Sequence, residues 1–200
     1  MRDNAVALVG GVAVGLALIF GWQGWKGHQS SRSADAAAQY DALRQAARSE
    51  DPSALADMAR SLQGEHAGSP YAVLAAMRVA EAQLEQGDAA AALATLENAP
   101  PTRGDSVLND LLNLRIARLR LATEDAQGAL DALGRLRAQR FAGLAAELRG
   151  DAERALDRPD AAREAYAEAL THLDAAAPVR SLVELKLTDL GGQPVAAPEA

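Results

Sequence analysis

The chain has 200 residues, a formal net charge of −7 and no cysteine. The missing cysteines exclude disulfides and thiolate metal sites, and acids and bases are interspersed without the basic patch that nucleic-acid binding requires. About a quarter of the residues are alanine and only 4% are aromatic, which favours closely packed helices over a β-sandwich or barrel. An all-α protein with one sizeable domain is therefore predicted.

The N-terminal stretch from Ala5 to Trp22 carries no charge and no proline. Its ~18 residues would span about 27 Å as a helix, close to the ~30 Å of a bilayer core. Residues 1–25 are therefore predicted to form a short tail and one transmembrane helix, with Trp22 and Trp25 at the membrane interface. A cleaved signal peptide is the main alternative, but after the apolar stretch the first Ala-x-Ala pattern begins only at Ala34. A buried helix of a soluble protein is a further alternative.

One face of this apolar stretch consists of small residues. Ala7, Gly11 and Gly15 recur at four-residue spacing, so a second membrane helix could pack closely on them. Glycine is also common in membrane helices in general, which leaves a specific partner helix open. Lys and Arg near the two ends are almost balanced, so charge counting alone does not fix the orientation.

The remainder of the chain has the periodicity of successive helices. After a polar linker at 26–33, helices are predicted over 34–48 and 53–65, the second with Asp51 as its cap and Pro52 at its first position. Three helix–turn–helix units follow, with helices over 70–86 and 89–99, 105–123 and 126–137, and 141–156 and 160–173. A last amphipathic helix over 178–190 would cap the domain 34–190, and residues 191–200 are predicted to be a disordered tail.

Small and large residues recur in register in these three units. Three rows have one member in each unit at the same two spacings: Ala80, Ala117 and Gly150; Ala92, Ala129 and Ala162; and Leu96, Leu133 and Tyr166. Only Ala or Gly fits where two helices of a hairpin cross closely, and each hairpin must stack on its neighbours to bury its apolar face. The period resembles that of the tetratricopeptide repeat, although all three units lack its large aromatic residue near the start. A generic alanine-rich bundle is the alternative.

No constellation of residues typical of an enzyme is evident, and no catalytic, cofactor or metal site is predicted. The histidines His28, His66 and His172 lack metal-ligand spacing. No nucleophile with a base stands out, and no glycine-rich phosphate loop follows a strand. Glu147 and Asp151, four residues apart, could form a carboxylate pair, but a helix face that lines a groove is favoured.

Stacked hairpins offer a different kind of site, because their first helices line a concave surface that can hold a segment of a partner protein. Register with the first small-residue row predicts six lining residues: Met77, Glu81, Leu114, Arg118, Glu147 and Asp151. The mixture of apolar and charged side chains suits peptide binding. The alternative is that the N-terminal or C-terminal helix of the chain itself fills this surface.

Several stretches, in this order, resemble one family, the YfgM-type ancillary subunits of the SecYEG translocon of Gram-negative bacteria. They are the GWQGWKGHQ segment at 21–29 with the later Tyr40, NLRIAR at 113–118, LRGD at 148–151 followed by AR at 162–163, and LKL at 185–187. The resemblance covers about residues 10–190. One departure is the segment before the apolar run, which is only residues 1–4 here and longer in the family.

The resemblance implies a protein of the inner membrane with a cytoplasmic N-terminus and a periplasmic tetratricopeptide-like stack. It also implies two partners, the SecYEG translocon and a membrane-anchored periplasmic chaperone of the prolyl-isomerase type. The implied role is to help pass newly translocated proteins, as unfolded clients, to periplasmic chaperones. A repeat scaffold for another envelope assembly is the alternative function.

Overall fold

The computed structural model describes residues 2–47, 52–137 and 139–193, and of the side chains before residue 30 it describes those of 15, 19–23 and 26. All regular structure in these ranges is helical. The helices are α1 (Arg2–Ala46), α2 (Pro52–Glu65), α3 (Pro70–Glu85), α4 (Ala89–Glu97), α5 (Ser106–Ala122), α6 (Ala126–Leu133), the short 3₁₀ helix η1 (Gln139–Phe141), α7 (Ala142–Ala155), α8 (Pro159–His172) and α9 (Arg180–Asp189).

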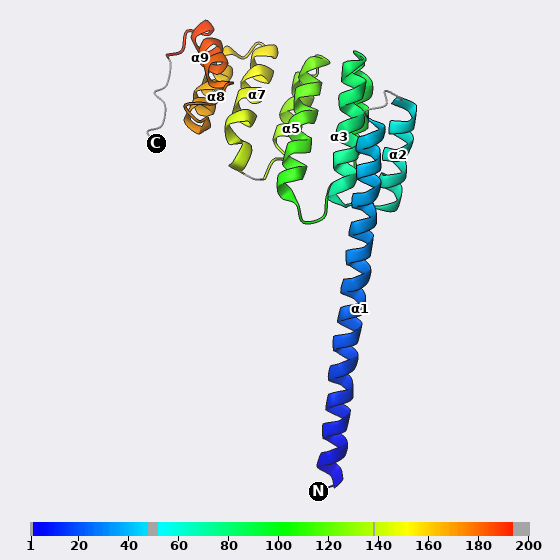
Figure 1. Ribbon diagram of the computed structural model, residues 1–200. Coiled ribbons are helices and arrows are strands. Elements are labelled where there is room, and N and C mark those ends of the chain that lie inside the picture. The colour runs from blue at the N-terminus through cyan, green and yellow to red at the C-terminus, as the bar shows by residue number, and fades with distance from the viewer. Residues whose placement is uncertain (1, 48–51, 138, 194–200) are drawn as a thin grey trace.

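The helices form a row of stacked hairpins (Figure 1). The pairs α3–α4, α5–α6 and α7–α8 are the three predicted units, and the C-terminal part of α1 forms a further hairpin with α2. The odd-numbered helices α1, α3, α5 and α7 stand side by side on the face that Figure 1 presents. α1 continues well beyond the stack, and α9 lies at the opposite end (Figure 1).

Local sequence explains where the hairpins turn. An acidic cap starts α4, α5 and α6: the side chains of Asp88, Asp105 and Asp125 each accept a backbone N–H from the first turn, at 2.8–2.9 Å. Within each hairpin the chain passes through one residue of positive φ, at corresponding positions of the three units. These are Gly87 at 81°, Glu124 at 64° and Asp157 at 58°, so only the first unit has the residue that this conformation favours.

The two small-residue rows and the third, large-residue row lie inside the stack, with Leu133 partly buried. The crossing-point residues Ala92, Ala117, Ala129 and Ala162 have no exposed surface. At Gly150 the helices are closer still, because a Cβ atom there would lie 2.4 Å from Cε1 of Tyr166. Glycine in this row is therefore the counterpart of a large residue, Tyr, in the third row.

The structure corrects the helix predicted over 34–48. α1 runs without a break from Arg2 to Ala46, so the polar linker predicted at 26–33 is part of a helix. Polarity alone does not end a helix, and residues 26–33 contain no proline and a single glycine, Gly27, before an alanine-rich segment. The helix predicted over 126–137 is also shorter, because Gly134 follows its last residue, Leu133.

Over the described residues, no helix has the length and apolarity that crossing a membrane requires. The predicted transmembrane stretch falls mostly on side chains outside the described set, including those of Ala7, Gly11 and Trp25. Ile19, Phe20 and Trp22 are described and exposed. The predicted cap Asp51 and residues 194–200 of the predicted tail also lie outside the described residues.

Candidate functional site

The face formed by the odd-numbered helices carries the predicted groove, and the structure divides the six predicted residues into three pairs. Met77 and Leu114 are buried, 4% and 6% exposed, and belong to the central core. Glu81 and Arg118 are exposed on α3 and α5. Glu147, which is 5% exposed, and the partly buried Asp151 lie beneath α9.

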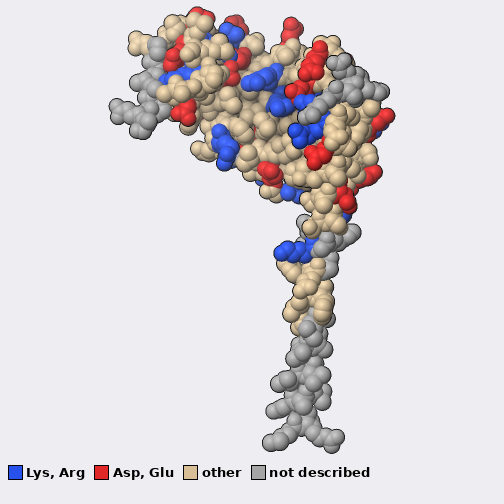
Figure 2. Space-filling view, in the orientation of Figure 1, with Lys and Arg blue, Asp and Glu red and all other residues tan. Residues whose placement is uncertain are grey.

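The middle of this face is open. Figure 2 shows Lys and Arg side chains gathered over α3 and α5, with Asp and Glu side chains beside them. Arg78 of α3 pairs with Glu81, whereas Arg115 and Arg118 are exposed and three residues apart on α5. Leu84 at the end of α3 is 44% exposed. Sequence analysis did not single out Arg115, although its spacing from Arg118 places the two on one helix face.

The C-terminal end of the face is closed by α9 through a buried ionic cluster. The ammonium Nζ of Lys186 lies 2.7 Å from Oε1 of Glu147 and 2.7 Å from Oδ2 of Asp151. The hydroxyl of Tyr166 donates to Oδ1 of Asp151 at 2.7 Å, and the same ammonium lies 5.8 Å from the centre of the Tyr166 ring. Sequence analysis missed Lys186, whose signal was a single cation within the apolar run of the last helix.

Tyr166 stays protonated in this cluster. Burial of its side chain and then its hydrogen bond to Asp151 raise the pKa of Tyr166 well above its ordinary value of 10.0. The phenol therefore acts as a hydrogen-bond donor at neutral pH and holds Asp151 toward Lys186.

α9 is fastened at its first turn as well. The guanidinium of Arg180 donates to the carbonyl of Leu170 at 2.8 Å and of Leu173 at 3.1 Å, at the C-terminal end of α8. A cation suits this position because the last carbonyls of a helix lack partners and carry partial negative charge. On the same helix, Val183 between the two fastenings and Leu187 just after the second are buried, 0% and 2% exposed. At this end of the stack, the predicted groove is therefore filled by the last helix of the chain itself, which was the alternative to an open groove.

The opposite end of the stack is closed by α1. Leu43 has no exposed surface, and the Tyr40 ring lies 5.8 Å from the ring of Tyr71 on α3. Gln39 donates to the carboxylate of Glu65 on α2 at 2.9 Å. This hydrogen bond, together with one from Ser61, lowers the pKa of Glu65 below its ordinary value of 4.5.

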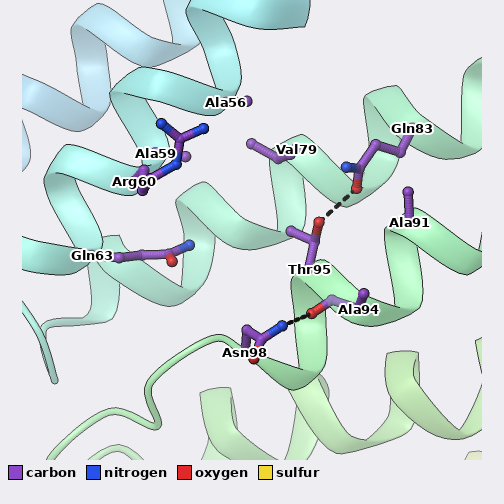
Figure 3. Close-up of a pocket in the computed structure, with 10 residues that line it drawn as sticks. All are labelled: Ala56, Ala59, Arg60, Gln63, Val79, Gln83, Ala91, Ala94, Thr95 and Asn98. Atoms are coloured by element: carbon purple, nitrogen blue, oxygen red, sulfur yellow. Dashed lines mark hydrogen bonds between the residues drawn. The ribbon is translucent and has the colours of Figure 1, made fainter.

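A second hollow lies between α2, α3 and α4 (Figure 3). It has a volume of about 400 Å³, with small apolar side chains such as Ala59 and Val79 and a polar rim that includes Arg60 and Gln83. The Thr95 hydroxyl donates to Gln83 at 2.8 Å, which fixes part of that rim. Sequence analysis missed this hollow because α2 precedes the recognised repeats. It could accept an apolar side chain of a partner protein.

Within the described residues, no group of His, Asp and Glu side chains could hold a metal ion. The acidic and basic groups of the open face lie on exposed helix surfaces, and those at the C-terminal end are engaged with one another. The arrangement is therefore suited to binding a protein segment.

Comparison with known proteins agrees with the sequence resemblance. The chain is 26% identical over 188 residues to the ancillary SecYEG translocon subunit of Escherichia coli, which covers 94% of this chain and 90% of that protein. It is 27% identical over 168 residues to the protein of that name from Haemophilus influenzae, covering 84% of this chain and 82% of the relative. A third, from Aggregatibacter actinomycetemcomitans, is 27% identical over 173 residues, with 86% and 83% covered.

No solved structure matches the chain. The family described as tetratricopeptide repeat-like domain matches residues 1–192, which include all the hairpins of the stack. The chain therefore belongs to the tetratricopeptide repeat-like domain family.

Proposed function

We propose that this protein is a membrane-anchored accessory subunit of the SecYEG translocon and that its repeat stack helps pass newly translocated proteins to periplasmic chaperones. One observation carries the proposal: the likeness to an ancillary SecYEG translocon subunit extends over 94% of the chain and 90% of that relative. A likeness confined to the repeats would support only the fold, whereas this one extends over almost the full length of both proteins.

The membrane anchor in this proposal is the uncharged run over 5–22. Its length matches a bilayer core, and the unbroken helix α1 connects it to the first hairpin. Gly15 supports a role for the small-residue face, because among the described residues a Cβ atom there would meet no atom within 4 Å apart from the backbone of its own helix, so a partner helix could approach. The orientation, with the stack in the periplasm, follows the family resemblance.

The open middle of the concave face is the proposed contact for a partner. Arg115, Arg118 and Leu84 are exposed there and offer charge and apolar surface to a protein segment. The partner in this proposal is a membrane-anchored chaperone of the prolyl-isomerase type or an unfolded client.

The first test is purification of the tagged full-length protein from its own membranes in mild detergent, with identification of the proteins that accompany it. We expect SecYEG subunits and a membrane-anchored periplasmic chaperone. An envelope complex that lacks translocon subunits would contradict the proposal and favour the scaffold alternative.

Variants of the anchor locate the contact. Gly11→Leu and Gly15→Leu are expected to reduce recovery of the translocon subunits, because bulky side chains prevent close helix packing. Gly10→Leu is the matched control, since it makes the same change about 100° around the helix. Equal recovery with all three variants would show that this helix face is not the contact.

A second set of variants tests the concave face. Arg118→Ala is expected to reduce recovery of the chaperone without affecting folding, because its side chain is exposed. Arg158→Ala, an exposed arginine in the turn between α7 and α8, is the control. Leu114→Ala is expected to destabilise the stack instead, because Leu114 is a core residue. Undiminished chaperone recovery with Arg118→Ala would exclude this residue from the contact.

A further inference from the structure

We propose that the surface of α7 and α8 beneath α9 is a helix-binding site, and that α9 is an exchangeable occupant of it. A partner helix with the same chemistry would replace α9. The inference concerns this end of the stack alone and is independent of the translocon assignment.

The acidic side of the site offers more hydrogen-bond acceptors than α9 uses. Two carboxylates, of Glu147 and Asp151, share one ammonium, that of Lys186. Oε1 of Glu147 is used, but its buried Oε2 atom has no hydrogen-bond partner among the described residues. A buried acceptor without a donor is unfavourable, so the site has capacity for a further N–H group. An arginine, with five donors in a planar fork, could reach both Glu147 and Asp151 where lysine leaves one oxygen without a partner.

The apolar side of the site fixes the pattern of its ligand. Val183 and Leu187 lie three residues before and one residue after Lys186, and both are buried. The ligand is therefore an amphipathic helix with an aliphatic residue, two free positions, a cation and a second aliphatic residue. α9 meets this pattern with lysine, and a partner helix with arginine at that position would meet it more completely.

Two further observations favour exchange. The outer face of α9 exposes Leu182 and Leu185, at 49% and 58%, so the helix is held from one side only. The outer face of a terminal capping helix is expected to be polar. The contact with α7 is a buried ion cluster, whose desolvation offsets much of its attraction. The net contribution of the intact cluster to retaining α9 is therefore small, but removing Lys186 alone would leave two carboxylates, Glu147 and Asp151, without a cation and would weaken the helix strongly.

The test uses the full-length protein in detergent and a fluorescent peptide with the sequence of residues 178–192 as the probe. We expect weak binding to the wild-type protein and at least tenfold tighter binding to the Lys186→Gln protein, in which the resident helix is weakened. A Lys186→Arg peptide should bind more tightly than the wild-type peptide, and a Lys186→Gln peptide at least tenfold more weakly. Leu182→Gln, on the outer face of α9, is the matched control protein and should bind like the wild type.

Hydrogen exchange on the wild-type protein is the second measurement, and it decides the question if the Lys186→Gln protein does not fold. Amides of residues 183–191 are expected to exchange at least tenfold faster than those in the middle of α7. Two results would overturn the proposal: exchange of α9 only together with α7 and α8, or no binding of the peptide to a folded Lys186→Gln protein.

Discussion

Gly150→Ala should destabilise the protein although alanine is the better helix former. The new Cβ atom would lie 2.4 Å from Cε1 of Tyr166, about 1 Å inside an ordinary carbon–carbon contact. The Tyr166 ring has no exposed surface and its hydroxyl is bound to Asp151, so the ring cannot easily move. Overpacking of this kind destabilises a protein by about 3 kcal/mol at the upper end of its range. The higher helix propensity of alanine over glycine stabilises it by about 1 kcal/mol. The expected net loss is about 2 kcal/mol.

The sign should reverse when the ring is removed. Tyr166→Leu combined with Gly150→Ala recreates the alanine and leucine that the other two units have at these positions, Ala80 with Leu96 and Ala117 with Leu133. Tyr166→Leu alone loses a hydrogen bond and leaves a cavity, but in that background Gly150→Ala should gain about 1 kcal/mol of helix propensity. The expected coupling energy between the two substitutions is therefore about 3 kcal/mol.

Urea unfolding of the wild type, both single variants and the double variant, followed by far-ultraviolet circular dichroism, measures this coupling. Tryptophan fluorescence would not serve, because the two tryptophans lie at 22 and 25, far from α7. Gly134→Ala is the matched control, since a Cβ atom there would lie 3.5 Å from its nearest neighbour, an ordinary contact. A cost of Gly150→Ala that is the same in both backgrounds, within about 0.5 kcal/mol, would refute the steric argument.

Three further predictions concern pH and a turn. The pKa of Glu65 is lowered in the folded protein, so its stabilising contact with Gln39 is present above pH 4.5 and is lost as the pH falls through the folded pKa. Hydrogen exchange in α1 and α2 should therefore increase as the pH falls through that value, and the increase should be smaller in a Gln39→Ala variant. The pKa of Tyr166 is raised, so its contribution to stability is present below pH 10.0 and is lost as the pH rises through the folded pKa. Ultraviolet titration should show ionisation of Tyr166 only together with unfolding, and a reversible ionisation of all three tyrosines in the folded protein would contradict this. Glu124→Gly should raise the urea midpoint, with a gain of about 0.5–1 kcal/mol, because Glu124 is exposed and has a φ of 64°; an unchanged or lower midpoint would mean that the turn is not strained.

The sequence predicted the hairpins well because their signals are local and repeated. Small residues in register mark the helix crossings, and Asp88, Asp105 and Asp125 mark helix starts whose caps the structure shows. The extent of α1 was not predicted, because residues 26–33 are polar and were interpreted as an end of the helix. In an exposed helix, polarity carries no such meaning, and only proline or a glycine-rich stretch would have ended it.

The candidate site was predicted in part. Glu81 and Arg118, selected by register, are exposed, but position in a repeat does not distinguish a groove from a covered surface. Glu147 is buried and bonded to Lys186, which lies 39 residues later in the chain. A contact so distant in sequence depends on how the final connection turns, and no local pattern encodes it. Met77 and Leu114 were apolar residues at a groove position, and neighbouring hairpins buried them in the core.

Because α1 is continuous, its length sets both the distance of the repeat stack from the N-terminal run and the direction in which the concave face points. Because one helix runs from Arg2 to Ala46, each residue added to or removed from it would change the height of the stack by about 1.5 Å and rotate the stack by about 100°. Two insertions would turn the concave face almost to the opposite side, and seven would nearly restore its heading about 10 Å farther out. The number of residues between the N-terminal run and Leu43 thus sets an angle as well as a length.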